Sequence, residues 1–137
     1  MAGNHFGFEN FKQLLSLNMG ISARLDENRA ESFTLLYCDF STVAKDLITE
    51  SLQNALRASD SIVNNKGDYF FVLPYTDKYG ADIVKKIFDE NFSCYLTSSF
   101  VSYPIDGKTS EALLNNLKET TKFCCKKNLT CLNKFLK

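Results

Sequence analysis

The sequence predicts an α+β domain with a ferredoxin-like βαββαβ order, an antiparallel-rich sheet with helices packed on one face. Three observations predict it. The nearly continuous apolar run Phe33–Cys38 is typical of a central strand covered on both faces. Segments 42–57 and 83–88 place apolar residues three and four apart, as in helices with one buried stripe. Between them, the polar turn Asn64–Asp68 separates two apolar runs, which indicates a hairpin.

The first half of the chain supplies three elements. A helix is expected to begin near Phe6 and to continue through Leu25, and a polar loop follows over Asp26–Glu31. The central strand ends at Asp39, and the helix of 42–57 comes next. The hairpin then combines a strand at 61–63 with a longer one at 69–73. Its turn residues Asn, Gly and Asp tolerate the positive φ that tight turns demand.

The second half repeats the pattern. After the helix around 83–88, Cys94–Tyr103 predicts a strand rich in aromatic and β-branched residues that Pro104 stops. Thr109 or Ser110 can cap a further helix. Leu129–Leu136 predicts a last edge strand, and the basic cluster before it predicts a solvated helix face (Lys118, Lys122, Lys126 and Lys127).

Composition narrows the function classes. The 137 residues predict one domain, 1–137, and the zero net charge gives no broad field for nucleic acid or an anionic membrane. No apolar run approaches the roughly 18 residues that span a bilayer, and no signal-peptide pattern opens the chain, so we expect a cytoplasmic protein. Five cysteines without CxxC spacing and a single histidine, His5, argue against a zinc site and predict reduced, structural thiols.

Two aspartates are the candidate site. In the predicted topology the end of the first strand lies beside the central hairpin, so Asp39 and Asp68 are expected to converge and could face a metal or a phosphate. The alternative is that Asp39 only marks the exit of its strand, while Gly67 and Asp68 only form the turn.

Five segments, in the right order, resemble the GGDEF domain, the palm-type diguanylate cyclase family. They are Asn4–Phe11, similar to its opening helix start; Leu35–Phe40, its first strand; Arg57–Asp60, its RxxD inhibitory-site motif; Asn65–Phe70, its signature hairpin; and Ser102–Thr109, its Tyr-Pro-x-Asp-Gly turn. The resemblance implies a GGDEF-like fold and, in active members, carboxylates that bind two divalent metals to align GTP for cyclisation.

The departures from that pattern predict a degenerate active site. Ser41 stands where the resemblance implies a second acid, and Val43-Ala44 stand at the Phe-Lys of the family. Only one helix separates Asp39 from Arg57, so the segment that reads guanine in the family has no counterpart.

The signature hairpin keeps a single carboxylate, in either of two registers. Its residues are Asn65, Lys66, Gly67, Asp68, Tyr69 and Phe70. In one register Asp68 takes the third signature position and Tyr69 replaces the glutamate; in the other, Gly67 takes the third position and Asp68 the fourth.

These observations lead to three hypotheses. The first is a non-catalytic GGDEF-like signalling domain that needs no cofactor. It would bind cyclic diguanylate (c-di-GMP) or another nucleotide through Arg57 and Asp60, or would act as a protein-interaction module. The alternative is a minimal metal-dependent nucleotide cyclase, diguanylate cyclase or nucleotidyltransferase in which Asp39 and Asp68 hold Mg²⁺. The third is a purely structural module that forms a homodimer. Neither nucleic acid nor a membrane is an expected partner.

Overall fold

The computed structural model describes residues 3–25 and 31–136. The βαββαβ core that the sequence predicts is present. Its elements are β2 (Glu31–Asp39), α2 (Lys45–Ala55), β3 (Ser61–Asn65), β4 (Asp68–Pro74), α3 (Lys78–Phe92) and β5 (Ser98–Pro104). Before the core come β1 (Asn4–His5), η1 (Phe8–Asn10) and α1 (Phe11–Leu25); after it come α4 (Ser110–Cys125) and the 3₁₀ helix η2 (Thr130–Phe135). Of the loop expected at Asp26–Glu31, 26–30 lie outside the described residues, and Glu31 begins β2.

The sheet has the strand order β1-β3-β4-β2-β5. β2 lies between β4 and β5 and is antiparallel to both, and β3 and β4 form the predicted hairpin. The short β1 adds a parallel edge strand beside β3 through Asn4 and His5. The fold class is therefore confirmed. The helix expected to begin near Phe6 begins two residues later, with η1 at Phe8, because Asn4 and His5 pair with β3 and the Phe6 N–H donates to the Ile62 carbonyl.

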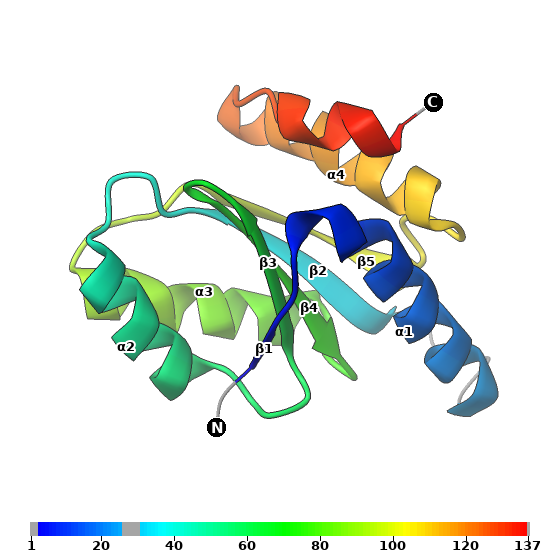
Figure 1. The fold of residues 1–137 in the computed structure, drawn as a ribbon, viewed down its shortest axis with the longest axis horizontal. Coiled ribbons are helices and arrows are strands. Elements are labelled where there is room, and N and C mark those ends of the chain that lie inside the picture. The colour runs from blue at the N-terminus through cyan, green and yellow to red at the C-terminus, as the bar shows by residue number, and fades with distance from the viewer. Residues whose placement is uncertain (1–2, 26–30, 137) are drawn as a thin grey trace.

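Helices cover both faces of the sheet, which corrects the expectation of a single covered face. α2 and α3 lie on one side, and α1 and α4 lie on the other (Figure 1). The side chains of β2 alternate between the two cores, with Leu35 and Tyr37 on the α1/α4 side and Leu36 and Cys38 on the α2/α3 side. This double burial explains why the apolar run of β2 is continuous instead of alternating.

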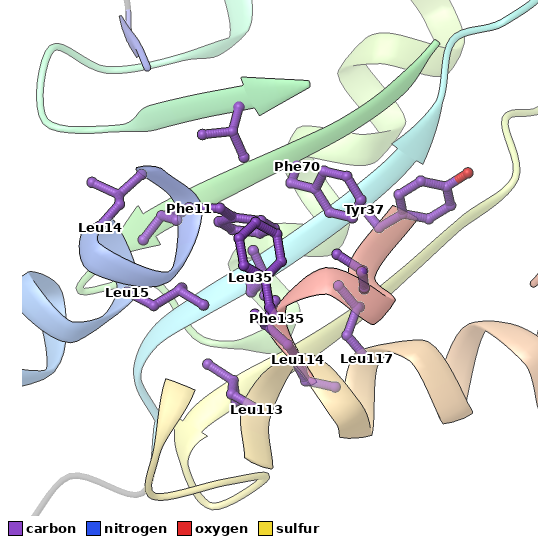
Figure 2. Packing of buried hydrophobic residues seen from close by; sticks show 14 of the residues in the cluster. Phe11, Leu14, Leu15, Leu35, Tyr37, Phe70, Leu113, Leu114, Leu117 and Phe135 are labelled. Carbon is purple, nitrogen blue, oxygen red and sulfur yellow. The ribbon is translucent and has the colours of Figure 1, made fainter. Parts of the chain in front are cut away.

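The α1/α4 face is closed by the end of the chain. Figure 2 shows side chains from both helices, the sheet and η2 converging on one cluster: Phe11, Leu14, Leu15, Leu35, Tyr37, Phe70, Leu113, Leu114, Leu117 and Phe135. The edge strand predicted for Leu129–Leu136 is wrong, since η2 is a 3₁₀ helix. Leu129, Leu132 and Phe135 recur every third residue and are all buried, which matches the three residues per turn of a 3₁₀ helix.

Candidate functional site

The β3–β4 hairpin has a two-residue loop, Lys66-Gly67, held against the segment that follows β2. Lys66 takes a positive φ of 54°, and its carbonyl accepts a hydrogen bond from Asn64 Nδ2. The sequence predicted Asn, Gly or Asp at the positive φ of this turn, but Lys66 takes that conformation instead. Gly67 is needed for a different reason: an added Cβ would lie 2.6 Å from Ser41 Cα. The Phe40 N–H donates to the Gly67 carbonyl at 2.8 Å, which fixes this close approach.

Asp39 and Asp68 lie directly opposite each other in the β2–β4 ladder. Because register partners project to the same face, both carboxylates lie on the α1/α4 side, beyond Tyr37 and Phe70. Each side chain keeps 21% of its surface exposed. The convergence expected from the topology is confirmed, and it occurs within a single cross-strand pair.

A lysine ammonium bridges the two carboxylates. Lys127 Nζ lies 3.0 Å from Asp39 Oδ2 and 3.0 Å from Asp68 Oδ1, and it stands 5.9 Å from the centroid of the Tyr37 ring. Lys127 follows α4, just after Lys126, which ends that helix in a left-handed conformation. The prediction of a solvated basic face is therefore wrong for Lys127, which serves as the counterion of the acid pair.

Neighbouring donors complete the surroundings of the acid pair. The Tyr37 hydroxyl donates to Asp68 Oδ1 at 2.7 Å, and the Ser41 N–H donates to Asp39 Oδ1 at 2.9 Å. Burial raises the pKa of Tyr37, and the bond to Asp68 raises it further, so Tyr37 remains a hydrogen donor at neutral pH.

The charges of the bridge reinforce one another. Burial alone would raise the pKa of Asp39, but hydrogen bonds from Ser41 and Lys127 outweigh it and hold that pKa below its usual value. Burial likewise opposes the charge of Lys127, yet its bonds to Asp39 and Asp68 raise its pKa. Asp39 is therefore ionised and Lys127 protonated across the physiological pH range.

This donor set does not fit the two-metal centre that the resemblance implies. Mg²⁺ prefers six oxygen ligands in near-octahedral geometry, with at least one or two carboxylates free to bind it. Here Lys127 pairs with both carboxylates, and Ser41 offers only a hydroxyl. Across residues 3–25 and 31–136, no group of three His, Cys, Asp or Glu side chains is placed to hold a metal ion.

A groove of about 1170 Å³ opens on the α2/α3 side of the sheet, and its lining extends from the hairpin along β3 to β1 and Gly3. Its floor is apolar and includes Phe40, Ile48 and Ile62 of the core beneath α2. Its described lining contains no carboxylate, and its ionisable side chains other than Tyr69 are His5, Lys45 and Lys66. The full lining is Gly3, Asn4, His5, Phe6, Phe40, Ser41, Val43, Lys45, Ile48, Thr49, Leu52, Gln53, Ile62, Asn64, Lys66, Gly67 and Tyr69.

The signature hairpin divides its side chains between the two faces. Tyr69 lines the groove and packs on Phe40, with ring centroids 4.9 Å apart. Phe70 is buried in the α1/α4 core, while Asn65 pairs with Asp68 across the hairpin. In both possible alignments with the signature motif, the residue after Asp68 is the aromatic Tyr69, so the hairpin has no second acid there.

Arg57 and Asp60 lie at the other end of the sheet. Asp60 is buried, and its carboxylate accepts the Arg57 backbone N–H at 2.8 Å and Arg57 Nη2 at 3.1 Å. The same Nη2 donates to the Pro74 carbonyl and to Thr76 Oγ1. Pro74 is six residues along β4 from Asp68, a distance of about 20 Å at the usual rise per residue. The RxxD pair thus connects the α2–β3 turn to the far end of β4 and lies apart from the acid pair.

Sequence reasoning placed Asp39 and Asp68 together but missed Lys127 and the groove. The Lys127–Asp39 contact spans 88 residues, and no periodicity marks it. The one available signal was the local excess of cations near the C-terminal end, together with two converging acids that lacked a counterion.

The fold is similar to that of a solved GGDEF-family structure. A sensory box/GGDEF family protein from Caulobacter crescentus superposes with a TM-score of 0.64 at 17% sequence identity, over 88% of this chain and 93% of that one. No protein-family model matches the sequence, and no curated protein matches it. At this identity the likeness establishes a GGDEF-like fold. No helix in the described part of the chain has both the length and the apolar character needed to cross a bilayer.

Proposed function

We propose that this chain is a catalytically degenerate GGDEF-like domain that acts by binding an anionic nucleotide, with c-di-GMP as the first candidate, and does not cyclise it. The observation that carries the proposal is the Lys127 ammonium, 3.0 Å from a carboxylate oxygen of both Asp39 and Asp68.

The bridge argues against metal-dependent phosphoryl chemistry. A divalent cation would have to displace Lys127 from both carboxylates and leave a partly buried ammonium without its partners. Removing one member of a buried ion pair costs several kcal/mol, about 3–5 when burial is complete. The hairpin and Ser41 provide no further acid to offset that cost, so the pair acts as a structural ion pair.

The composition of the groove supports the binding of an anionic nucleotide. Phosphates favour lysines and helix N-termini, and a nucleobase favours an apolar floor. Lys66 comes from the hairpin and Lys45 begins α2, whose N-cap residue, Ala44, has no side chain to cap the helix. An anion here would meet two ammonium groups and no described carboxylate, and it would not need a metal to offset repulsion.

Arg57 is the second candidate contact. Its side chain is 54% exposed, and its three side-chain hydrogen bonds to described residues all use Nη2. Nε and Nη1 remain as donors, and each can donate a single hydrogen bond to a phosphate or a guanine. Arg57 does not line the groove, although the Gly3 N–H of the lining donates to the Arg57 carbonyl at 2.9 Å, so separate variants test the two locations.

Titration calorimetry with c-di-GMP, and in parallel with GTP, tests the proposal. We expect the wild-type chain to bind one of them. Removing both groove lysines (Lys45→Ala with Lys66→Ala) should weaken binding roughly 10- to 100-fold, as expected for lost charge-assisted contacts. Lys122→Ala, which removes an exposed lysine of α4, is the matched control and should have no effect.

The other outcomes are equally definite. Loss of binding only in Arg57→Ala would place the ligand at the RxxD pair and remove the groove from the proposal. No heat with either nucleotide at high micromolar concentration would reject nucleotide binding and leave a protein-interaction or homodimerisation role. Asp39-dependent product after incubation with nucleoside triphosphates and Mg²⁺ or Mn²⁺ would overturn the non-catalytic assignment in favour of a minimal cyclase.

A further inference from the structure

Two adjacent cysteines end α4, and their sulfur atoms are in contact. The Sγ atoms of Cys124 and Cys125 lie 2.8 Å apart. Cys124 is exposed and Cys125 half-buried, so a small reagent can reach the pair from solvent. The other three free cysteines are isolated from this pair in the sequence, and Cys38 among them is fully buried.

Neighbouring groups hold the pair in place. Cys125 Sγ donates to the Ser98 carbonyl at 3.4 Å, which holds the end of α4 against the start of β5. Burial and the hydrogen bond that Cys124 donates to Cys125 raise the pKa of Cys124 to about 11, so Cys124 is a thiol at neutral pH.

Geometry favours bridging by a third atom over a direct disulfide. Cα atoms of neighbouring residues are about 3.8 Å apart, whereas disulfides usually join Cα atoms about 4.4–6.8 Å apart. A disulfide here would distort the end of the helix. A bridging atom lets the sulfurs separate slightly by side-chain rotation alone.

The same geometry selects the type of atom. With sulfur bonds of about 2.3 Å, as in zinc–thiolate sites, a linear two-coordinate ion would need sulfurs about 4.6 Å apart. A pyramidal centre with angles near 90° needs only about 3.3 Å, close to the distance between these thiols. Because no third His, Cys, Asp or Glu completes a site within the described residues, the third ligand must come with the ion.

We propose that Cys124 and Cys125 form a vicinal dithiol site for a trivalent, thiophilic metalloid of the arsenic(III) class. In the binding step an organoarsenous acid, R–As(OH)₂, exchanges both hydroxyls for the two sulfurs. Two As–O bonds break and two As–S bonds form. The two thiol protons leave in two molecules of water, and no atom is oxidised or reduced. The proposal is independent of nucleotide binding.

Phenylarsine oxide, which hydrates to such an acid, is the probe, and intact-protein mass spectrometry is the measurement. We expect the folded wild-type chain to gain one phenylarsenic group with the loss of two hydrogens. The adduct should survive a large excess of a monothiol and be removed by dithiothreitol, because two protein sulfurs hold the arsenic.

Serine variants locate the adduct. Cys124→Ser and Cys125→Ser should each lose the monothiol-resistant adduct, whereas Cys94→Ser, which changes an exposed cysteine elsewhere, should keep it. Circular dichroism verifies that each variant is folded. The proposal is overturned if the wild-type chain forms no monothiol-resistant adduct, if either pair variant retains it, or if Cys94→Ser abolishes it.

Discussion

The two faces of the sheet meet at the same hairpin and differ in their electrostatics. On the α1/α4 side, two carboxylates are paired with Lys127 and covered by the segment after α4. On the α2/α3 side, a groove carries Lys45 and Lys66 and no described carboxylate. Gly67 and Ser41 form the boundary between the two, and the close approach of their backbones leaves no room for a further side chain.

The negative charge of the acid pair and the open space of the groove are therefore on opposite faces of the sheet. A phosphoryl-transfer site needs its metal-binding acids beside the phosphates of its substrate. Here the internal cation already satisfies the acids, and the open space presents positive charge. Such an arrangement favours holding an anion over reacting with it.

Removing the internal cation should have the largest effect on stability. Lys127→Met leaves Asp39 and Asp68 facing each other without a counterion, so the free energy of unfolding should fall by about 2 kcal/mol, less than for a fully buried pair. Urea denaturation measures this as a lower midpoint with an unchanged m-value. Lys122→Met is the control, and an equal effect of both variants would mean that the bridge contributes nothing.

A methyl group at the boundary should have the next largest effect. Gly67→Ala places a Cβ 2.6 Å from Ser41 Cα, so the backbone must shift, at a cost of about 1–2 kcal/mol. The same urea experiment measures it. Gly20→Ala is the matched control, because a Cβ at Gly20 meets no atom within 4 Å. A Gly67→Ala chain as stable as the wild type would show that the hairpin and the segment after β2 are not locked together.

Asp39 should also make the stability of the folded chain depend on pH in the acid range. The pKa of Asp39 is lower in the folded chain than in the unfolded chain, so its contribution is complete above about pH 4 and is lost as pH falls through the folded value. Asp39→Asn should reduce the loss of stability between about pH 5 and pH 2, because the substituted residue no longer takes up a proton. If the free energy of unfolding falls equally with pH in Asp39→Asn and in the wild-type chain, the folded structure does not stabilise the Asp39 carboxylate.

Lys127 should produce the smallest change, at the alkaline end. Its folded pKa is raised, so its contribution is present below about pH 10 and is lost as pH rises through the folded value. As pH rises above about 10, the melting temperature should fall less for Lys127→Met than for Lys122→Met. If the melting temperatures of the two variants fall equally, the Lys127 ammonium does not interact with the two carboxylates in solution.

The sequence predicted the parts of this molecule that local pattern determines. The continuous apolar run of β2 identified a strand buried on both faces, and the βαββαβ order placed Asp39 beside Asp68. The C-terminal 3₁₀ helix was missed because alternation and three-residue spacing are hard to distinguish over eight residues, as with Leu129, Leu132 and Phe135. Lys127 and the groove were missed because each depends on side chains that only the folded chain brings together.

Nucleotide affinity measured with and without Mg²⁺ distinguishes a groove that binds through its lysines from a site that needs a metal ion. If binding depends on the lysines of the groove, the calorimetric affinity of the wild-type chain for c-di-GMP or GTP should be the same in millimolar Mg²⁺ and in excess chelator. Asp39→Asn should leave that affinity unchanged. Binding that requires Mg²⁺ and is lost in Asp39→Asn would show instead that the carboxylates hold a metal ion that binds the nucleotide.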